Sequence, residues 1–156
     1  MRAITLATAF AIAVAPFAPG LAAGPDYLGT WKLSGAVVAP WADPAARKPD
    51  NAGPERLLGK TLVFKAGEIA GPRPFACKGA HYKLKDYTAD MLFQGAFGEM
   101  QSKNKSADPA KIAASLGFPA ARIETLETGC GIDFHFVDGA TAKIGLNDYV
   151  NTLKKQ

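Results

Sequence analysis

The chain is poor in the residues that carry out catalysis. Its 156 residues include two cysteines and two histidines, and its only serines, none of which is near a histidine in the sequence, are Ser34, Ser102, Ser106 and Ser115. The Gly-x-Ser-x-Gly, His-Glu-x-x-His and phosphate-binding glycine motifs are missing. Because no motif that carries a mechanism is present, we predict no catalytic residue, no cofactor and no metal, and a protein that is not an enzyme.

Clustered positive charge is missing as well. The formal net charge is +4, from 18 Lys and Arg against 14 Asp and Glu, but the basic residues are scattered along the chain. Aromatic residues do not alternate with them in a nucleic-acid-binding pattern. The composition therefore argues against nucleic acid as a partner and leaves a small apolar ligand or an exported protein, bound by a chain that we expect to be a monomer.

A long hydrophobic run occurs only at the start of the chain. Arg2 precedes an apolar stretch over residues 3–17, and small residues follow at 20–23. This pattern is typical of a secretory signal peptide, with cleavage after Ala22 or Ala23. The run is short for a membrane span and is interrupted by Pro16 and Pro19, so we expect no transmembrane anchor after cleavage. We predict a signal peptide over residues 1–23, one domain over residues 24–156, and a periplasmic or secreted location.

The two cysteines, Cys77 and Cys130, have two interpretations. In an oxidising compartment an even number of cysteines favours a disulfide, and a loop of this length would stabilise the fold by about 4 kcal/mol. The alternative is a zinc site formed with His81 and His135, because two cysteines and two histidines can bind zinc tetrahedrally. Zinc-binding cysteines are usually two to four residues apart, and these are not, so we predict the disulfide.

The pattern of apolar residues predicts a mainly β protein. Gly35 within the first strand indicates a bulge, and Asp138-Gly139 marks a hairpin turn. One short helix is predicted near residues 109–116, with Asp108 as its N-cap and Pro109 in its first position. About eight strands at this spacing predict a small antiparallel β-barrel, with a β-sandwich as the alternative. The predicted strands are 27–38, 60–65, 67–71, 80–87, 91–97, 122–127, 132–136, 140–146 and 149–155.

Residues 40–59 are predicted to form a long loop, because four prolines lie between Pro40 and Pro54. Gly29-Thr30-Trp31, just before this loop, resembles the Gly-x-Trp motif of the lipocalin and calycin group. The resemblance implies an eight-stranded barrel in which Trp31 closes one end beneath a cation from the last strand, here Lys154 or Lys155. The loop is similar to the lid at the open end of such barrels. The large helix before the last strand of lipocalins has no counterpart.

Two functions of different classes fit these patterns. The first is an exported binding protein that holds an apolar small ligand inside the barrel, gated by residues 40–59. The ligand-binding side chains would be Trp31, Trp41, Phe64, Tyr82, Phe134 and Phe136. The second is a periplasmic inhibitor or interaction module that acts on a hydrolase by inserting residues 38–42 or 72–75.

One further pair of polar residues stands out on a predicted strand. Asp133 and His135 are two residues apart, so they share one face of the strand. They form either a titratable pair or part of a solvated outer face.

Overall fold

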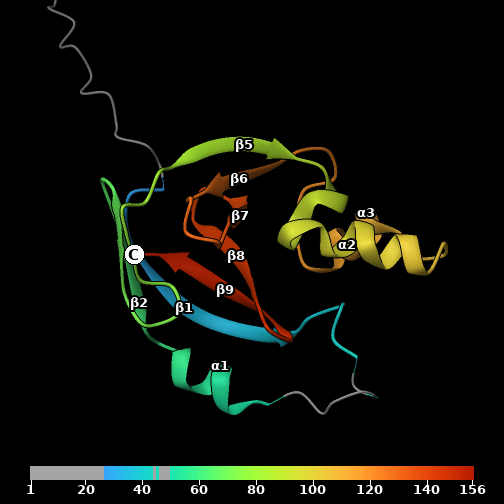
Figure 1. The fold of residues 1–156 in the computed structure, drawn as a ribbon, viewed down its shortest axis with the longest axis horizontal. Coiled ribbons are helices and arrows are strands. Elements are labelled where there is room, and N and C mark those ends of the chain that lie inside the picture. The colour runs from blue at the N-terminus through green and yellow to red at the C-terminus, as the bar shows by residue number, and fades with distance from the viewer. Residues whose placement is uncertain (1–26, 44, 46–49) are drawn as a thin grey trace, which may run out of the picture.

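The computed structural model describes residues 27–43, 45 and 50–156, so the predicted signal peptide lies outside the described residues. These residues fold into one curled antiparallel sheet in the order β4-β3-β2-β1-β9-β8-β7-β6-β5 (Figure 1). The mainly β, barrel-like prediction is therefore confirmed, as a half-barrel. The strands are β1 (Gly29–Val38), β2 (Thr61–Lys65), β3 (Glu68–Ala70), β4 (Cys77–Lys78), β5 (Lys83–Tyr87), β6 (Ile123–Glu127), β7 (Phe134–Asp138), β8 (Thr141–Leu146) and β9 (Tyr149–Lys155).

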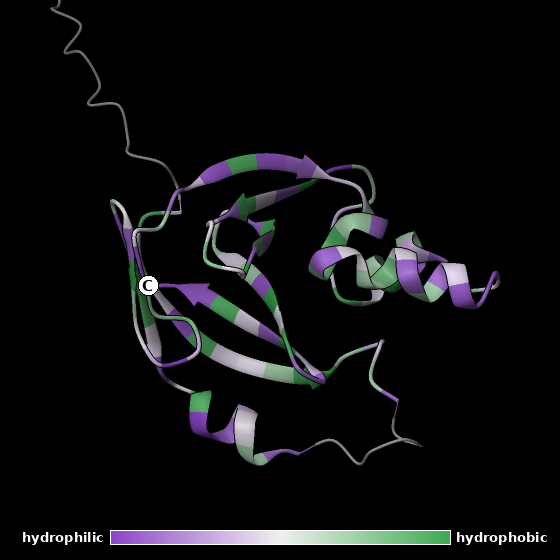
Figure 2. Ribbon diagram, in the orientation of Figure 1, coloured by the Kyte–Doolittle hydropathy of each residue, from purple (hydrophilic) through white to green (hydrophobic). Residues whose placement is uncertain are grey.

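The curl of the sheet encloses a hydrophobic core. Alternation along the strands turns side chains such as Trp31, Leu62 and Leu153 inward, where they are almost fully buried. The edge strand β5 is mostly hydrophilic (Figure 2), and most of its residues are exposed. The predicted bulge is present, because the register of β1 with β9 shifts between Leu33 and Gly35.

The two edges of the sheet are joined by side-chain and loop contacts. Cys77, on the edge strand β4, forms a disulfide with Cys130 in the turn between β6 and β7, and the two Cα atoms are 6.2 Å apart. The Tyr82 hydroxyl, next to the start of β5, donates to the Glu68 carbonyl of β3 at 2.7 Å. The predicted disulfide is thus present, and it links residues near opposite edges of the curled sheet.

A helical segment is inserted between β5 and β6. It contains the short helix η1 (Ala89–Met91), α2 (Leu92–Lys103) and α3 (Pro109–Ser115), and residues 89–115 are called the helical cap below. Figure 1 shows the cap lying to one side of the sheet. Its apolar residues, including Leu92, Phe97 and Ala113, form a second buried cluster with Ile123 and Val150 of the sheet.

Three details of the predicted secondary structure were wrong. Residues 91–97 were predicted as a strand, but they lie in the cap, where the backbone from Phe93 to Gly95 is left-handed and Phe93 and Phe97 are buried against the sheet. Residues 40–59 are not loop throughout, because α1 (Ala52–Leu57) forms there and buries Leu57. The two-residue strand β4 was not predicted, although the nine strands among the described residues agree with the expectation of about eight.

The predicted helix near 109–116 is confirmed as α3. The Asp108 carboxylate accepts hydrogen bonds from the amides of Ala110 and Lys111, as an N-cap residue does, and Pro109 follows it. No helix in the described part of the chain is both long and apolar enough to cross a membrane.

Candidate functional site

Most of the side chains predicted to bind a ligand lie in the core, packed against one another. The ring centroids of Trp31 and Phe136 are 5.7 Å apart, and those of Phe64 and Phe134 are 4.8 Å apart. Tyr82 is half-buried beside Phe64, at 6.2 Å between ring centroids. These rings therefore fill space in the interior of the sheet.

The contact that the lipocalin resemblance implies at Trp31 is present. The Lys155 ammonium lies 5.8 Å from the centroid of the Trp31 ring, within the range of a cation–π interaction. Lys154, the other candidate, donates instead to the Thr141 hydroxyl. Trp31 thus lies beneath a cation from the last strand.

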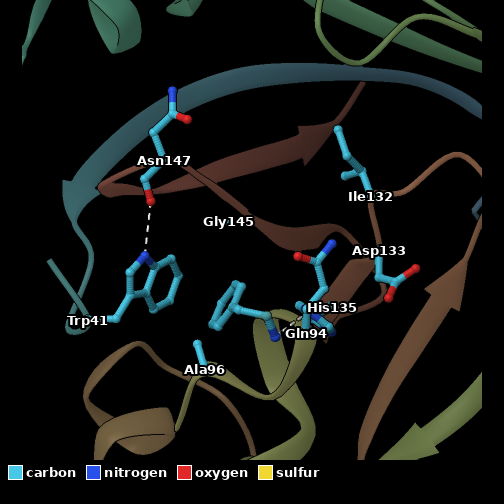
Figure 3. A pocket seen from close by; sticks show the side chains of 9 residues that line it. Trp41, Gln94, Ala96, Ile132, Asp133, His135, Gly145 and Asn147 are labelled. Carbon is cyan, nitrogen blue, oxygen red and sulfur yellow. Dashed lines mark hydrogen bonds between the residues drawn. The ribbon is translucent and has the colours of Figure 1, made fainter. Parts of the chain in front are cut away.

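Trp41, the remaining predicted ligand residue, lines a pocket on the other side of the sheet. On β7, Phe134 and Phe136 face the core whereas His135 faces the helical cap. The pocket between this face and the cap has a volume of about 150 Å³ (Figure 3). We call it the cap pocket, and its lining residues are Trp41, Phe93, Gln94, Ala96, Ile132, Asp133, His135, Gly145 and Asn147.

The wall formed by the cap contains an unusual turn. Phe93, Gln94 and Gly95 have φ values of 52°, 61° and 82°, so three consecutive residues are left-handed. This conformation costs about 1–2 kcal/mol for a residue with a Cβ, and glycine alone adopts it freely. Compensating contacts hold the turn, among them the Gln94 amide nitrogen, which donates to the Gly131 carbonyl at 2.8 Å.

His135 holds the same turn from the sheet. Its Nε2 accepts a hydrogen bond from the Phe93 amide at 3.0 Å, so Nε2 carries no proton. Nδ1, 2.9 Å from the Thr125 hydroxyl, must then donate, and that hydroxyl in turn donates to the Ile123 carbonyl. Burial lowers the pKa of the His135 imidazole to about 3. The ring is therefore neutral, and both of its nitrogens are occupied within the protein.

The opposite wall depends on a glycine in β8. A Cβ built on Gly145 would lie 3.1 Å from ring atoms of both Trp41 and Phe93. The Trp41 indole nitrogen donates to the Asn147 carbonyl at 2.9 Å, and its ring centroid is 5.1 Å from that of Phe93. Only glycine allows the two rings to pack so closely on the strand.

Asp133 is the one lining residue with a formal charge. It is half-buried, and burial raises the pKa of its carboxyl, with a further increase from the negative charge of Glu127. The cation near this pair, Lys85, binds Glu127 at 2.9 Å. The Tyr87 hydroxyl also donates to Glu127, whereas Asp133 accepts a hydrogen bond from the Thr128 backbone amide, which partly offsets the increase in its pKa.

The structure does not assemble the zinc site considered as an alternative. Cys77 and Cys130 bond to each other, His81 is exposed and His135 is enclosed under the cap. Within the described ranges no group of three or more His, Cys, Asp or Glu residues is placed to hold a metal ion.

The aromatic residues of the two loops considered for insertion into a partner pack within the protein. Trp41 belongs to the cap pocket, and Phe75 is buried in the core.

Sequence reasoning found part of the cap pocket. It placed Asp133 and His135 on one strand face, and both line the pocket, but it missed Phe93, Gln94, Gly145 and Asn147. Gly95 was the available signal for a turn here, because glycine favours left-handed backbone. The remaining residues contribute through tertiary packing, which local patterns do not reveal.

The fold and the pocket together define a small, mainly β half-barrel with a single-ring-sized pocket between its sheet and an inserted helical cap. Comparisons of the chain with protein-family models, curated proteins and solved structures found no match.

Proposed function

We propose that the protein is an exported small-molecule binding protein and that its ligand occupies the cap pocket. The observation that carries this proposal is the left-handed turn at Phe93, Gln94 and Gly95, which forms one wall of the pocket. Strained backbone of this kind persists where the surrounding structure holds it in place, and it is concentrated at functional sites. Here His135 and Gln94 provide the hydrogen bonds that hold it.

The size and lining of the pocket support a small ligand with an apolar part. A cavity of about 150 Å³ accommodates benzene when its walls are apolar. Trp41 and Phe93 offer aromatic surface, whereas Gln94 and Asp133 offer polar groups. The lining thus combines two aromatic rings with several polar groups, and polar groups placed beside apolar surface fix the orientation of a ligand.

The sequence supports export. Residues 1–23 have the composition of a signal peptide. A disulfide is consistent with an oxidising compartment, because disulfides persist there and are rare in the cytosol. The pocket would then sample small molecules outside the cytoplasm.

The protein contains two tryptophans, which makes the binding site testable by NMR. The indole N–H signals of Trp31 and Trp41 can be assigned with a Trp41→Phe variant and followed while a panel of small aromatic compounds is added. Binding in the cap pocket should shift the Trp41 signal and leave that of Trp31 unchanged. A shift of the Trp31 signal alone would place the ligand in the barrel interior instead.

A matched pair of glycine variants tests whether the pocket itself is responsible. Gly145→Ala places a methyl group against Trp41 and Phe93 and should weaken binding about tenfold or more. Gly139→Ala is the control, because a Cβ there meets no atom within 4 Å. Equal affinity in both variants would contradict the proposed site.

A further inference from the structure

We infer that the cap pocket selects small organic cations, namely amines that carry one ring-sized apolar group. This inference rests on the proposed function and adds the chemical class of the ligand. The apolar group would pack on Trp41 and Phe93, and the ammonium group would lie toward Asp133.

The first argument is the charge of the lining. None of the nine lining residues is Lys or Arg, and Asp133 supplies the one formal charge. Asp133 forms no ion pair with any Lys or Arg in the part of the chain that the structure describes. A half-buried carboxylate without a cationic partner is stabilised by a ligand that brings one.

The second argument is the balance of hydrogen-bond donors and acceptors. The Trp41 indole N–H is bound to the Asn147 carbonyl, and the Phe93 amide is bound to His135. The Gln94 amide nitrogen donates one of its two protons to Gly131, and its carbonyl oxygen remains as an acceptor. With these donors occupied, the pocket offers acceptors, and an ammonium group is a donor only.

The third argument is the position of the aromatic rings. Trp41 and Asp133 lie toward opposite ends of the pocket, with Gln94 between them (Figure 3). An amine with an aromatic ring on a short linker could place its ring on Trp41 and its nitrogen near Gln94 and Asp133.

The test compares three probes that share one ring and differ in charge. We would titrate the protein with 2-phenylethylamine, 2-phenylethanol and phenylacetate at neutral pH and follow the Trp41 indole signal. The amine should bind about tenfold more tightly than the alcohol, because a charge-assisted hydrogen bond replaces a neutral one, and phenylacetate should bind least tightly.

Substitutions of lining residues test whether the preference for the amine comes from the cap pocket. Asp133→Asn should reduce the ratio of amine affinity to alcohol affinity from about tenfold to about one, because the lining then carries no formal charge. Asp86→Asn is the matched control, because Asp86 pairs with Arg122 on the exposed surface of the sheet and should keep the preference. If Asp133→Asn fails to fold, Gln94→Lys serves instead, since it adds a cation at an exposed lining residue and should reverse the preference toward phenylacetate.

The outcomes separate this inference from the function on which it rests. Equal binding of amine and alcohol, with a shift of Trp41, would overturn the charge selectivity and leave the binding function standing. Binding of neutral compounds alone would do the same. If no aromatic compound of any charge shifts the Trp41 signal, both the inference and the proposed function fail.

Discussion

Gln94 is one of three residues other than glycine, with Phe93 and Asn147, whose backbone is left-handed in the described part of the chain. Its φ of 61° is left-handed although its side chain is exposed, so burial of that side chain does not compensate for the backbone energy. The hydrogen bond to Gly131 and the packing of Phe93 beside it keep the turn in place. Strain at this position is a property of the native state that mutation can measure.

A comparison of Gln94→Gly with Gln94→Ala isolates that strain, because both variants lack the amide group. At a left-handed position glycine should give the more stable protein, by about 1 kcal/mol. In an ordinary right-handed helix the order is reversed, with alanine favoured by about 1 kcal/mol. Urea unfolding of the two variants decides between these outcomes, and a more stable alanine variant would show that the turn is not left-handed in solution.

His135 should make the stability of the protein depend on pH. Its pKa falls from 6.5 to about 3 in the folded state, so the unfolded chain binds the proton more readily. Stability is therefore complete above about pH 6.5 and is lost as the pH falls toward 3, by an amount on the order of 4–5 kcal/mol. Urea unfolding at a series of pH values measures this loss.

The His135→Gln variant provides the control for the pH dependence. Glutamine keeps an acceptor for the Phe93 amide but does not titrate, so the slope of stability against pH below 6.5 should become shallower. His81→Gln, at an exposed histidine, should retain the wild-type slope. If His135→Gln and the wild type lose stability in parallel, protonation of His135 is not the cause.

At the scale of elements, alternating patterns predicted the strands well because one face of most strands packs on the core. The pattern at Ile132, Phe134 and Phe136 is of this kind, and β7 forms where it was expected. Residues 91–97 were misassigned because a short, nearly continuous apolar run fits a buried strand or a buried helix equally well. Gly95 was taken as part of a strand, whereas it completes a left-handed turn that only the contact with the sheet stabilises.

Local sequence patterns also could not predict how the edge strands pair. β4 is only two residues long and pairs with β3 next to the disulfide, so its sequence carries no periodicity. The disulfide itself was predicted from the expected oxidising compartment and the even number of cysteines. That it joins the two edges of the sheet could be seen only from the order of the strands. The contribution of the disulfide to stability can be measured directly.

Replacement of both cysteines by alanine should destabilise the protein by about 4 kcal/mol, because the unfolded chain gains the entropy of a long open loop. In the folded variant, the loss of protection against hydrogen exchange should be confined to the residues near the missing disulfide. Hydrogen exchange in the β3–β4 ladder beside Cys77, and at the His81 amide, which donates to Thr128 two residues before Cys130, should accelerate, while exchange in the β1–β9 ladder should stay slow. A uniform acceleration would mean that the disulfide stabilises the whole sheet rather than the strands next to it.

For the whole molecule, the two buried clusters lie on opposite sides of the same sheet. The core cluster includes Trp31 and Leu153, and the cap cluster includes Phe97 and Val150, with β7 contributing Phe136 to the first and His135 to the contact with the cap. In the chain, the cap is inserted between β5 and β6, and β5 is an edge strand of the sheet. The strands β1, β9 and β8 lie at the centre of the sheet. The cap pocket therefore lies between a stable central layer and an inserted segment.

This arrangement should let the cap open without global unfolding. The seven-residue α3 is too short to be stable alone, and the cap depends on Phe93, Phe97 and Phe118 for its packing. Amide exchange in α2 and α3 should therefore report a lower free energy of opening than exchange at Leu33 and Leu153 in the central strands. A ligand bound in the cap pocket should slow exchange in the cap alone.

The His135→Gln variant tests directly whether the cap opens independently of the sheet. Weakening the bond to the Phe93 amide should accelerate exchange in the cap and leave the β1–β9 ladder unchanged under conditions where the sheet stays folded. If cap and ladder accelerate together, the two clusters unfold as one cooperative unit. In that case the cap pocket opens only with the whole protein, and ligand entry requires the side chains of Trp41 and Gln94 to move while the backbone of the cap stays in place.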